Sequence, residues 1–262
     1  MEIALHVIVL LVLAAFVAGW VDAVVGGGGL IQLPSLLIGL PADTSVAAIS
    51  GTNKVSSAAG TLTATATYLR KVSVDWKAAV PLMVLAYLGS TIGARLVNFL
   101  PKQAFTPIVL AALVGVGIYT VRKPTLGLHH QVRWTGWRGA AVAAAIGLVV
   151  GLYDGFLGPG TGSFFVIALV GLLGYGFLQA SVLAKLANLT TNVAAIAVFS
   201  IQGVIIWKLA LMMAAANLTG GFIGAQMAVR HGSGFVRKVF LAVVGLLVVK
   251  LAYDTVLLMV GR

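Results

Sequence analysis

Apolar runs long enough to cross a membrane recur along this chain, and residues 3–21 form the first of them. A membrane-spanning helix needs about 20 consecutive apolar residues. The chain has 262 residues, of which 60% are hydrophobic and 9% are charged, whereas soluble domains carry about 25% charged residues. The longest polar connection covers only residues 122–138. The sequence therefore predicts an all-α polytopic membrane protein and leaves no room for a sizeable soluble domain.

The first apolar run is interpreted as a span and not as a cleaved signal peptide. A glycine-rich break follows it directly, and no small-x-small cleavage site precedes that break. The net charge of +11 comes mostly from basic residues in loops at helix ends. Retention of cytoplasmic loops explains this charge without a nucleic-acid partner. The absence of cysteine excludes disulfides and thiol chemistry.

The chain contains two copies of one unit. Asp22 and Asp154 are 132 positions apart (154 − 22), and Lys54 and Lys185 are 131 apart (185 − 54). One single-residue gap reconciles the two offsets. The offset of 131 also relates Trp76 to Trp207, Lys77 to Lys208, Gly89 to Gly220, Ile92 to Ile223, Gly93 to Gly224 and Ala94 to Ala225. We expect a first transmembrane repeat at 1–121, a basic cytoplasmic linker at 122–137 and a second transmembrane repeat at 138–262.

Each unit is predicted to hold about five helical segments. They are 3–25, 29–40, 44–69, 76–98 and 103–121 in the first unit, and 138–157, 162–177, 180–202, 207–229 and 236–260 in the second. Segment 29–40 is too short to cross a ~30 Å core unaided. It is either half of a re-entrant hairpin or a short tilted span. In both cases each unit crosses an odd number of times, and the second copy is inverted. Only an interrupted single crossing at 3–40 would make the copies parallel.

Basic residues favour the inverted arrangement. The loop at 70–77 is basic while its counterpart at 201–208 has only Lys208, and this bias reverses between the loops at 95–102 and 230–238. An inverted repeat under the positive-inside rule predicts such a reversal. The linker is basic too, which places it with 70–77 and 230–238 on the cytoplasmic side and both termini outside.

Two glycine-rich breaks interrupt the apolar runs, and each begins four residues after an aspartate. The first holds Gly26, Gly27, Gly28 and Gly29, and the second holds Gly158, Gly160, Thr161 and Gly162. Broken helices that meet near the midplane of an inverted repeat are typical of transporters. A break before a helix presents free N–H groups and a positive dipole end, which favour an anion. Alternatively, the glycines allow close helix packing or a kink.

Lys54 and Lys185 lie in apolar helices at equivalent positions, with Asn53 beside the first and Asn188 and Asn192 beside the second. An ammonium group inside a membrane usually marks a substrate path or a buried pair. The alternative is a lysine that snorkels to the interface. The repetition and the amide-rich neighbourhood favour side chains that point inward, toward a substrate.

Asp22 and Asp154 complete this symmetric set. They could pair with the lysines, cap free N–H groups or carry a coupling proton. An anion beside an aspartate favours the protonated carboxyl group, which gives proton coupling a physical basis. Elsewhere, Asn217 and Gln226 lie on otherwise apolar helices and could face the pathway.

Other chemistry has little support in the sequence. The four histidines show no metal-ligand spacing with a second ligand set, and no nucleophile–base constellation is present. We expect no metal, no cofactor and no enzymatic activity. The partners expected are a small anionic substrate and the lipid bilayer, with a homo-oligomer left open.

At these residues the chain resembles the TauE/SafE family of membrane transporters, also called the sulfite exporter or TSUP family. The resemblance rests on residues 19–34 (GWVDAVVGGGGLIQLP), residues 151–164 (GLYDGFLGPGTGSF), and the stretches around Lys54 and Lys185. It implies a carrier of the bacterial inner membrane that moves sulfur-containing anions such as sulfite or sulfoacetate, usually outward. Pro159 stands in the place of Gly27 and removes one N–H group, so the two cradles need not contribute equally.

The favoured hypothesis is a secondary transporter with its anion held between the two breaks. An anion channel, or a membrane subunit that needs a partner, is the first alternative. A cation carrier that uses the two aspartates is the second. The preferred anion, the direction of transport and the coupling ion stay open at this point.

Overall fold

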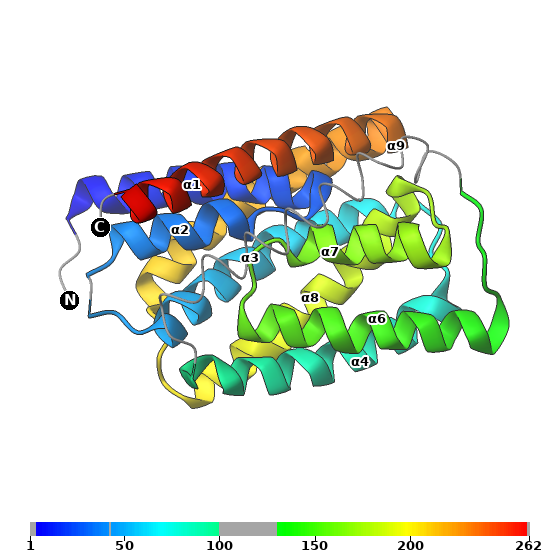
Figure 1. Cartoon of the computed structure of the whole chain (residues 1–262), viewed down its shortest axis with the longest axis horizontal. Coiled ribbons are helices and arrows are strands. Elements are labelled where there is room, and N and C mark those ends of the chain that lie inside the picture. Colours follow the sequence, from blue (N-terminus) through cyan, green and yellow to red (C-terminus); the bar gives the residue numbers. More distant parts are fainter. Residues whose placement is uncertain (1–3, 42, 100–129, 261–262) are drawn as a thin grey trace.

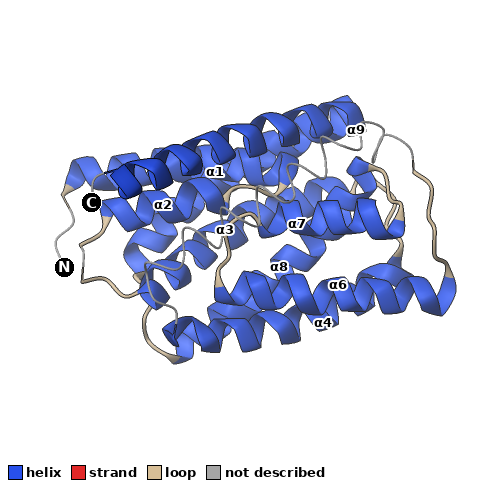
Figure 2. Cartoon of the chain, in the orientation of Figure 1, coloured by secondary structure: helices blue, strands red, loops and turns tan. Residues whose placement is uncertain are grey.

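The computed structural model describes residues 4–41, 43–99 and 130–260, and this part of the chain is helical without strands (Figure 2). Eight α-helices lie within these ranges (Figure 1): α1 (Leu5–Val25), α2 (Gly29–Gly39), α3 (Val46–Leu69), α4 (Trp76–Leu96), α6 (Gly136–Phe156), α7 (Thr161–Ala168), α8 (Phe177–Ile201) and α9 (Trp207–Val260). A 3₁₀ turn, Val97–Phe99, extends α4. The predicted segment 103–121 lies outside the described residues.

Five stretches are long and apolar enough to cross a membrane: Leu5–Val25, Trp76–Phe99, Gly136–Phe156, Phe177–Ile201 and Trp207–Val239. Large apolar side chains on several of them are exposed, such as Leu10, Val149 and Leu211. Apolar side chains exposed on this many helices suit a hydrocarbon surrounding. The prediction of an all-α polytopic membrane protein is confirmed.

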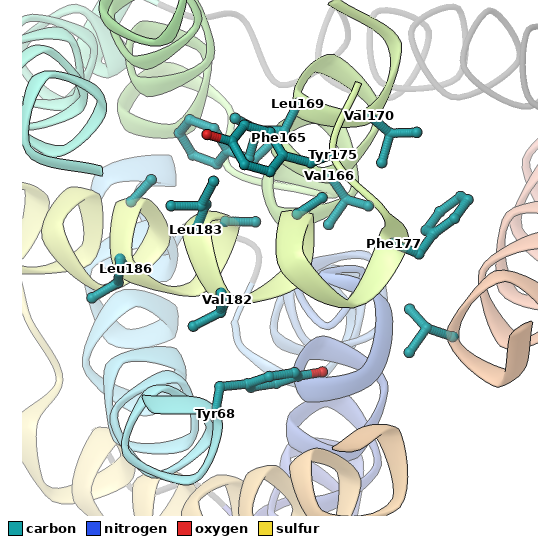
Figure 3. Packing of buried hydrophobic residues seen from close by; sticks show 14 of the residues in the cluster. Tyr68, Phe165, Val166, Leu169, Val170, Tyr175, Phe177, Val182, Leu183 and Leu186 are labelled. Atoms are coloured by element: carbon teal, nitrogen blue, oxygen red, sulfur yellow. The ribbon is translucent and has the colours of Figure 1, made fainter. Parts of the chain in front are cut away.

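Helix α8 lies at the centre of the bundle. In its most apolar stretch of 18 residues, 72% is buried, which is the highest share among the five candidate spans. It packs against α3, α4, α7 and α9. Figure 3 shows Val182 and Leu183 of α8 between Phe165 of α7 and Tyr68 of α3. This core fixes α3 and α8, which carry the two lysines, side by side.

The first short helix folds back along the helix before it. Gly39 at the end of α2 lies against Val7 and Leu11 near the start of α1. In Figure 1, α1 runs from one end of the molecule past the middle, and α2 returns toward the same end. At about 1.5 Å per residue, 11 residues cover ~16 Å, too little to cross. Helix α2 is therefore too short to cross by itself, and it forms a helical hairpin with α1.

Helices α6 and α7 form the corresponding hairpin from the other end. Arg133, just before α6, donates its N–H to the carbonyl of Leu173 (2.9 Å) and its guanidinium to that of Gly171 (2.6 Å). The end of the α7 segment thus lies beside the start of α6. In Figure 1, α6 runs opposite to α1, and the two hairpins approach each other in the middle of the molecule.

Some predicted boundaries were wrong in the second unit. Segment 162–177 ends at a π-helical turn, Leu169–Leu173, because Gly174 takes a left-handed conformation (φ 81°), and α8 begins at Phe177 instead of 180. The predicted segments 207–229 and 236–260 are confirmed as two helical stretches under the one label α9: the backbone leaves the helical conformation at Gly232 (φ 70°, ψ −168°), and the chain turns back on itself there (Figure 1). Glycine adopts positive φ without a steric cost. The predicted linker 122–137 is shorter at its end, since α6 begins at Gly136.

Equivalent glycines make equivalent contacts between the two units. On α4, Gly89 and Gly93 lie against the carbonyl oxygens of Leu148 and Leu152 on α6. On α9, Gly220 and Gly224 lie against those of Phe16 and Trp20 on α1. The carbonyl partners are again 132 positions apart (148 − 16 and 152 − 20). Because an added Cβ would overlap these backbones, the small residues set the close approach of both helix pairs.

The loops predicted to share one side meet at one end of the bundle. The Tyr175 hydroxyl donates to Asp75 (2.6 Å), and the Leu178 N–H donates to Ser233 (3.0 Å). Gln131 donates its N–H to the Gly174 carbonyl (2.9 Å). Burial raises the pKa of Tyr175 above its ordinary value, and the bond to Asp75 adds to this. In Figure 1 the described chain begins and ends at the opposite end. Which end faces the cytoplasm stays a prediction.

Candidate functional site

The two glycine breaks touch each other in the middle of the molecule. The Ser163 N–H donates to the Gly26 carbonyl (3.1 Å), and the Ser163 hydroxyl donates to the Val25 carbonyl (2.9 Å). Gly26 and Gly162 approach so closely that a Cβ on either would overlap the backbone of the other. The end of α1 and the start of α7, one from each hairpin, therefore meet directly.

The conformation of the breaks requires glycine at three positions. Gly26, Gly158 and Gly160 have φ of 80°, 87° and 76°. A side chain in this left-handed region costs about 1–2 kcal/mol. Gly160 is the N-cap of α7, and Thr161 closes the loop by donating its hydroxyl to the Gly158 carbonyl (2.8 Å). The first N–H groups of a helix have no acceptor within that helix. The breaks thus place the N-terminal ends of α2 and α7 beside each other.

A small cavity lies where the breaks meet, and it brings together most of the predicted site. Its lining comes from both units: Asp22, Gly26, Gly29, Asn53, Lys54, Ser57, Asp154, Gly158, Gly160, Thr161, Gly162, Asn188 and Asn192. Of the predicted residues, Gly27, Gly28 and Lys185 do not line it. Gly28 lies instead against the Ala18 carbonyl and the Asp22 side chain, so close packing explains this glycine.

Both predicted lysines are buried in ion pairs, which excludes the snorkelling alternative. Lys54 is 3% exposed, and its Nζ lies 2.5 Å from Oδ2 of Asp154. Lys185 is 1% exposed, and its Nζ lies 2.9 Å from Oδ2 of Asp22. The pairs are crosswise, because each lysine comes from one unit and its aspartate from the other. Of the roles left open for the aspartates, pairing with the lysines is the one that these contacts display.

The two pairs are equivalent in sequence but differ in their surroundings. Lys185 donates a second hydrogen bond to the Asp22 carbonyl oxygen, and Asp22 also accepts from the Thr61 hydroxyl (3.3 Å). Lys54 lines the cavity, with its Cε near Gly158, whereas Lys185 does not. The Lys185–Asp22 pair thus has more hydrogen bonds, and only Asp22 of this pair lines the cavity, whereas both members of the Lys54–Asp154 pair do.

Two amides leave polar atoms without a partner at the cavity. Within the described part of the chain, Asn192 Nδ2 and Asn53 Oδ1 are buried and have no hydrogen-bond partner. Leaving such a group unpaired costs about 1–3 kcal/mol. Asn192 is 1% exposed and offers a donor. A ligand that accepts hydrogen bonds at the cavity would satisfy it.

Sequence reasoning did not select two further residues that contribute here. Ser57 lines the cavity, and Thr61 donates to Asp22. Both follow Lys54 along α3 at spacings of three and seven residues, which places them on one helix face. This helical spacing from Lys54 is the sequence signal that could have identified both residues. Asn217 lies outside the cavity and instead donates to Gln32 (2.8 Å) and to the Ala15 carbonyl (3.0 Å), which ties α9 to α1 and α2.

The cavity has almost no free volume in this arrangement. Its volume is about 10 Å³, and a cavity needs about 10–15 Å³ on this measure to hold one water molecule. A polyatomic anion does not fit without movement. The charges around it are balanced, since each of the two aspartates in its lining is paired with a lysine. A larger occupant must part the two hairpins and compete for at least one ammonium group.

Comparison with known proteins agrees with this architecture. Residues 11–251 match the family model described as "Sulfite exporter TauE/SafE". The chain is 32% identical to "Probable membrane transporter protein ORF9" of Sinorhizobium sp, over 97% of this chain and 95% of that protein. It is also 32% identical to a "Probable membrane transporter protein" of Haemophilus influenzae, over 97% and 98%. The Escherichia coli relative YfcA, which carries the same description, is 31% identical over 92% and 88%. No solved structure matches the chain.

Proposed function

Because the chain belongs to the sulfite exporter TauE/SafE family of membrane transporters, we propose that it is a secondary transporter that exports small sulfur-containing anions across the bacterial inner membrane. Sulfite and organosulfonates such as sulfoacetate are the proposed substrates. The observation that carries the proposal is the cavity between the two hairpins, with the buried Lys54 and the unpaired Asn192 donor at its wall.

Substrate binding is proposed to proceed by exchange of ion-pair partners. An anion that enters the cavity takes the place of the Asp154 carboxylate beside Lys54. Asn192 and the N-terminal ends of α2 and α7 then donate to its oxygen atoms, as helix N-termini do for oxyanions. The released Asp154 carboxyl group can take a proton, which would couple anion and proton movement. Lys185 stays bound to Asp22 and keeps the α1–α2 hairpin in register.

We further propose that the two units form an inverted repeat, with the linker side in the cytoplasm. The equivalent glycine contacts, the crosswise ion pairs and the opposite directions of α1 and α6 support this arrangement. In such folds, alternating access comes from one unit that rocks against the other around a fixed site. The contact between Gly26 and Gly162 would then be the pivot between the hairpins.

Flux through purified protein in proteoliposomes tests the function. Labelled sulfite and sulfoacetate should show saturable flux, with and without a pH gradient, and unlabelled sulfite should compete. Flux that does not saturate would instead identify an anion channel, an alternative that the very small volume of the cavity disfavours. Absence of flux for every anion in a panel of sulfur oxyanions and sulfonates would reject the proposal. Cation flux insensitive to sulfite would identify a cation carrier.

A further inference from the structure

A second and much larger pocket lies away from the central cavity, between the C-terminal end of α3 and the middle of α9. Its volume is about 630 Å³, within the range of pockets that hold small molecules. It is open to the surroundings, and none of its lining residues belongs to the ion pairs or to the lining of the central cavity. We call it the α3–α9 groove.

The rim of the groove is basic. Arg70, Lys71, Arg230 and His231 line it and are exposed, and no acidic residue is among its described lining residues. The acidic residue nearest to Arg70 and Lys71 in the sequence, Asp75, already accepts hydrogen bonds from the Tyr175 hydroxyl and from the Lys77 N–H. Three permanent positive charges around one groove attract an anion.

The inner part of the groove is apolar. Phe222 is 47% exposed and Ile223 is 40% exposed, and both lie within the apolar stretch Trp207–Val239. From Phe222 to Arg230 is eight residues, which corresponds to about 12 Å along a helix. The groove therefore runs from a charged helix end to a depth of roughly 12 Å toward the hydrocarbon region. A small soluble anion would use only its outer half.

We propose that the α3–α9 groove binds an anionic phospholipid. The phosphate lies between Arg70 and Lys71 on one side and Arg230 on the other, and the first acyl carbons lie along Phe222 and Ile223. Clusters of basic residues beside a membrane span are attracted to anionic lipids. The bound lipid bridges α3, which carries Lys54, and α9, which packs on α1. The site is independent of the transported substrate.

The test compares lipids on the purified full-length protein. Native mass spectrometry and thermal unfolding are recorded with phosphatidylglycerol, with phosphatidylcholine and with inorganic phosphate. Phosphatidylglycerol should be retained and should raise the unfolding temperature, while the other two should not. Each charge removed should weaken phosphatidylglycerol binding about fivefold, so the triple variant Arg70→Gln, Lys71→Gln, Arg230→Gln should lose it.

The control is the double variant Lys77→Gln, Arg138→Gln. Both residues are basic and exposed and lie outside the groove. This variant should retain phosphatidylglycerol as the wild type does. Equal binding of phosphatidylcholine would show a merely apolar groove, and an equal shift with inorganic phosphate would show a site for free anions. Either result, or an equal loss in both variants, overturns the proposal. If the triple variant fails to fold, Arg230→Gln alone gives the same comparison.

Discussion

Replacement of Lys54 by methionine separates the structural and the transport roles of the crosswise ion pair. Methionine keeps most of the aliphatic stem, so packing changes little while the charge is lost. The variant leaves the Asp154 carboxylate buried, at 2% exposure, without its partner. Asp154→Asn leaves the Lys54 ammonium group unpaired in the same way, and the double variant removes both charges.

The magnitude follows from the geometry. At 2.5 Å and an effective dielectric constant near 20, the attraction between two unit charges is about 7 kcal/mol. Desolvation offsets part of it, and breaking a buried pair by removing one partner costs about 3–5 kcal/mol. In a chain of this size that is a fall in unfolding temperature of about 6–20 °C. The double variant leaves no buried charge and should regain most of this loss.

Two measurements on the same samples complete the experiment. Thermal unfolding in detergent gives the double-mutant cycle, and labelled-anion flux in proteoliposomes gives the function. We expect stability to recover in the double variant while flux stays lost. The reason is that the variant lacks the Lys54 ammonium group, beside which the anion would take the place of the Asp154 carboxylate. The exposed Lys208→Met is the control and should change neither. Wild-type flux in the Lys54 variant would refute the reasoning, and so would a double variant no more stable than the single ones.

Three further predictions rest on the same site. Asn192→Leu should leave the unfolding temperature unchanged or higher and should raise the KM for the anion, because it removes an unpaired buried donor. Gly26→Ala should prevent folding, because its Cβ would overlap Gly162, whereas Gly203→Ala, with a similar φ and open space, should cost only about 1–2 kcal/mol in unfolding assays. Asn217→Leu should lower stability by about 1–3 kcal/mol through unpairing Gln32, with the substrate preference in flux competition unchanged.

Most of the candidate site could be predicted because the chain repeats its unusual residues. A single buried-looking lysine has several explanations, but Lys54 and Lys185 at equivalent places, with an aspartate equally repeated, point to one location. Spacing could not show which lysine pairs with which aspartate, since the crosswise pairs join residues 100 and 163 positions apart (154 − 54 and 185 − 22). Nor could composition locate the end of α7, because the apolar run continues through Gly174, whose backbone conformation ends the helix.

The crosswise ion pairs join the two units, and the proposed substrate competes for one of these pairs. Each hairpin contributes the aspartate, and the opposite unit contributes the lysine, so neither hairpin can move away without breaking a buried ion pair. Breaking such a pair in an apolar interior is costly unless another anion replaces the carboxylate. In the proposed mechanism, the substrate anion supplies that replacement at Lys54. Without substrate, the Lys54–Asp154 pair would keep the two hairpins together. A bound anion would replace the Asp154 carboxylate at Lys54 and so lower the energy barrier to the movement of the hairpins that transports it.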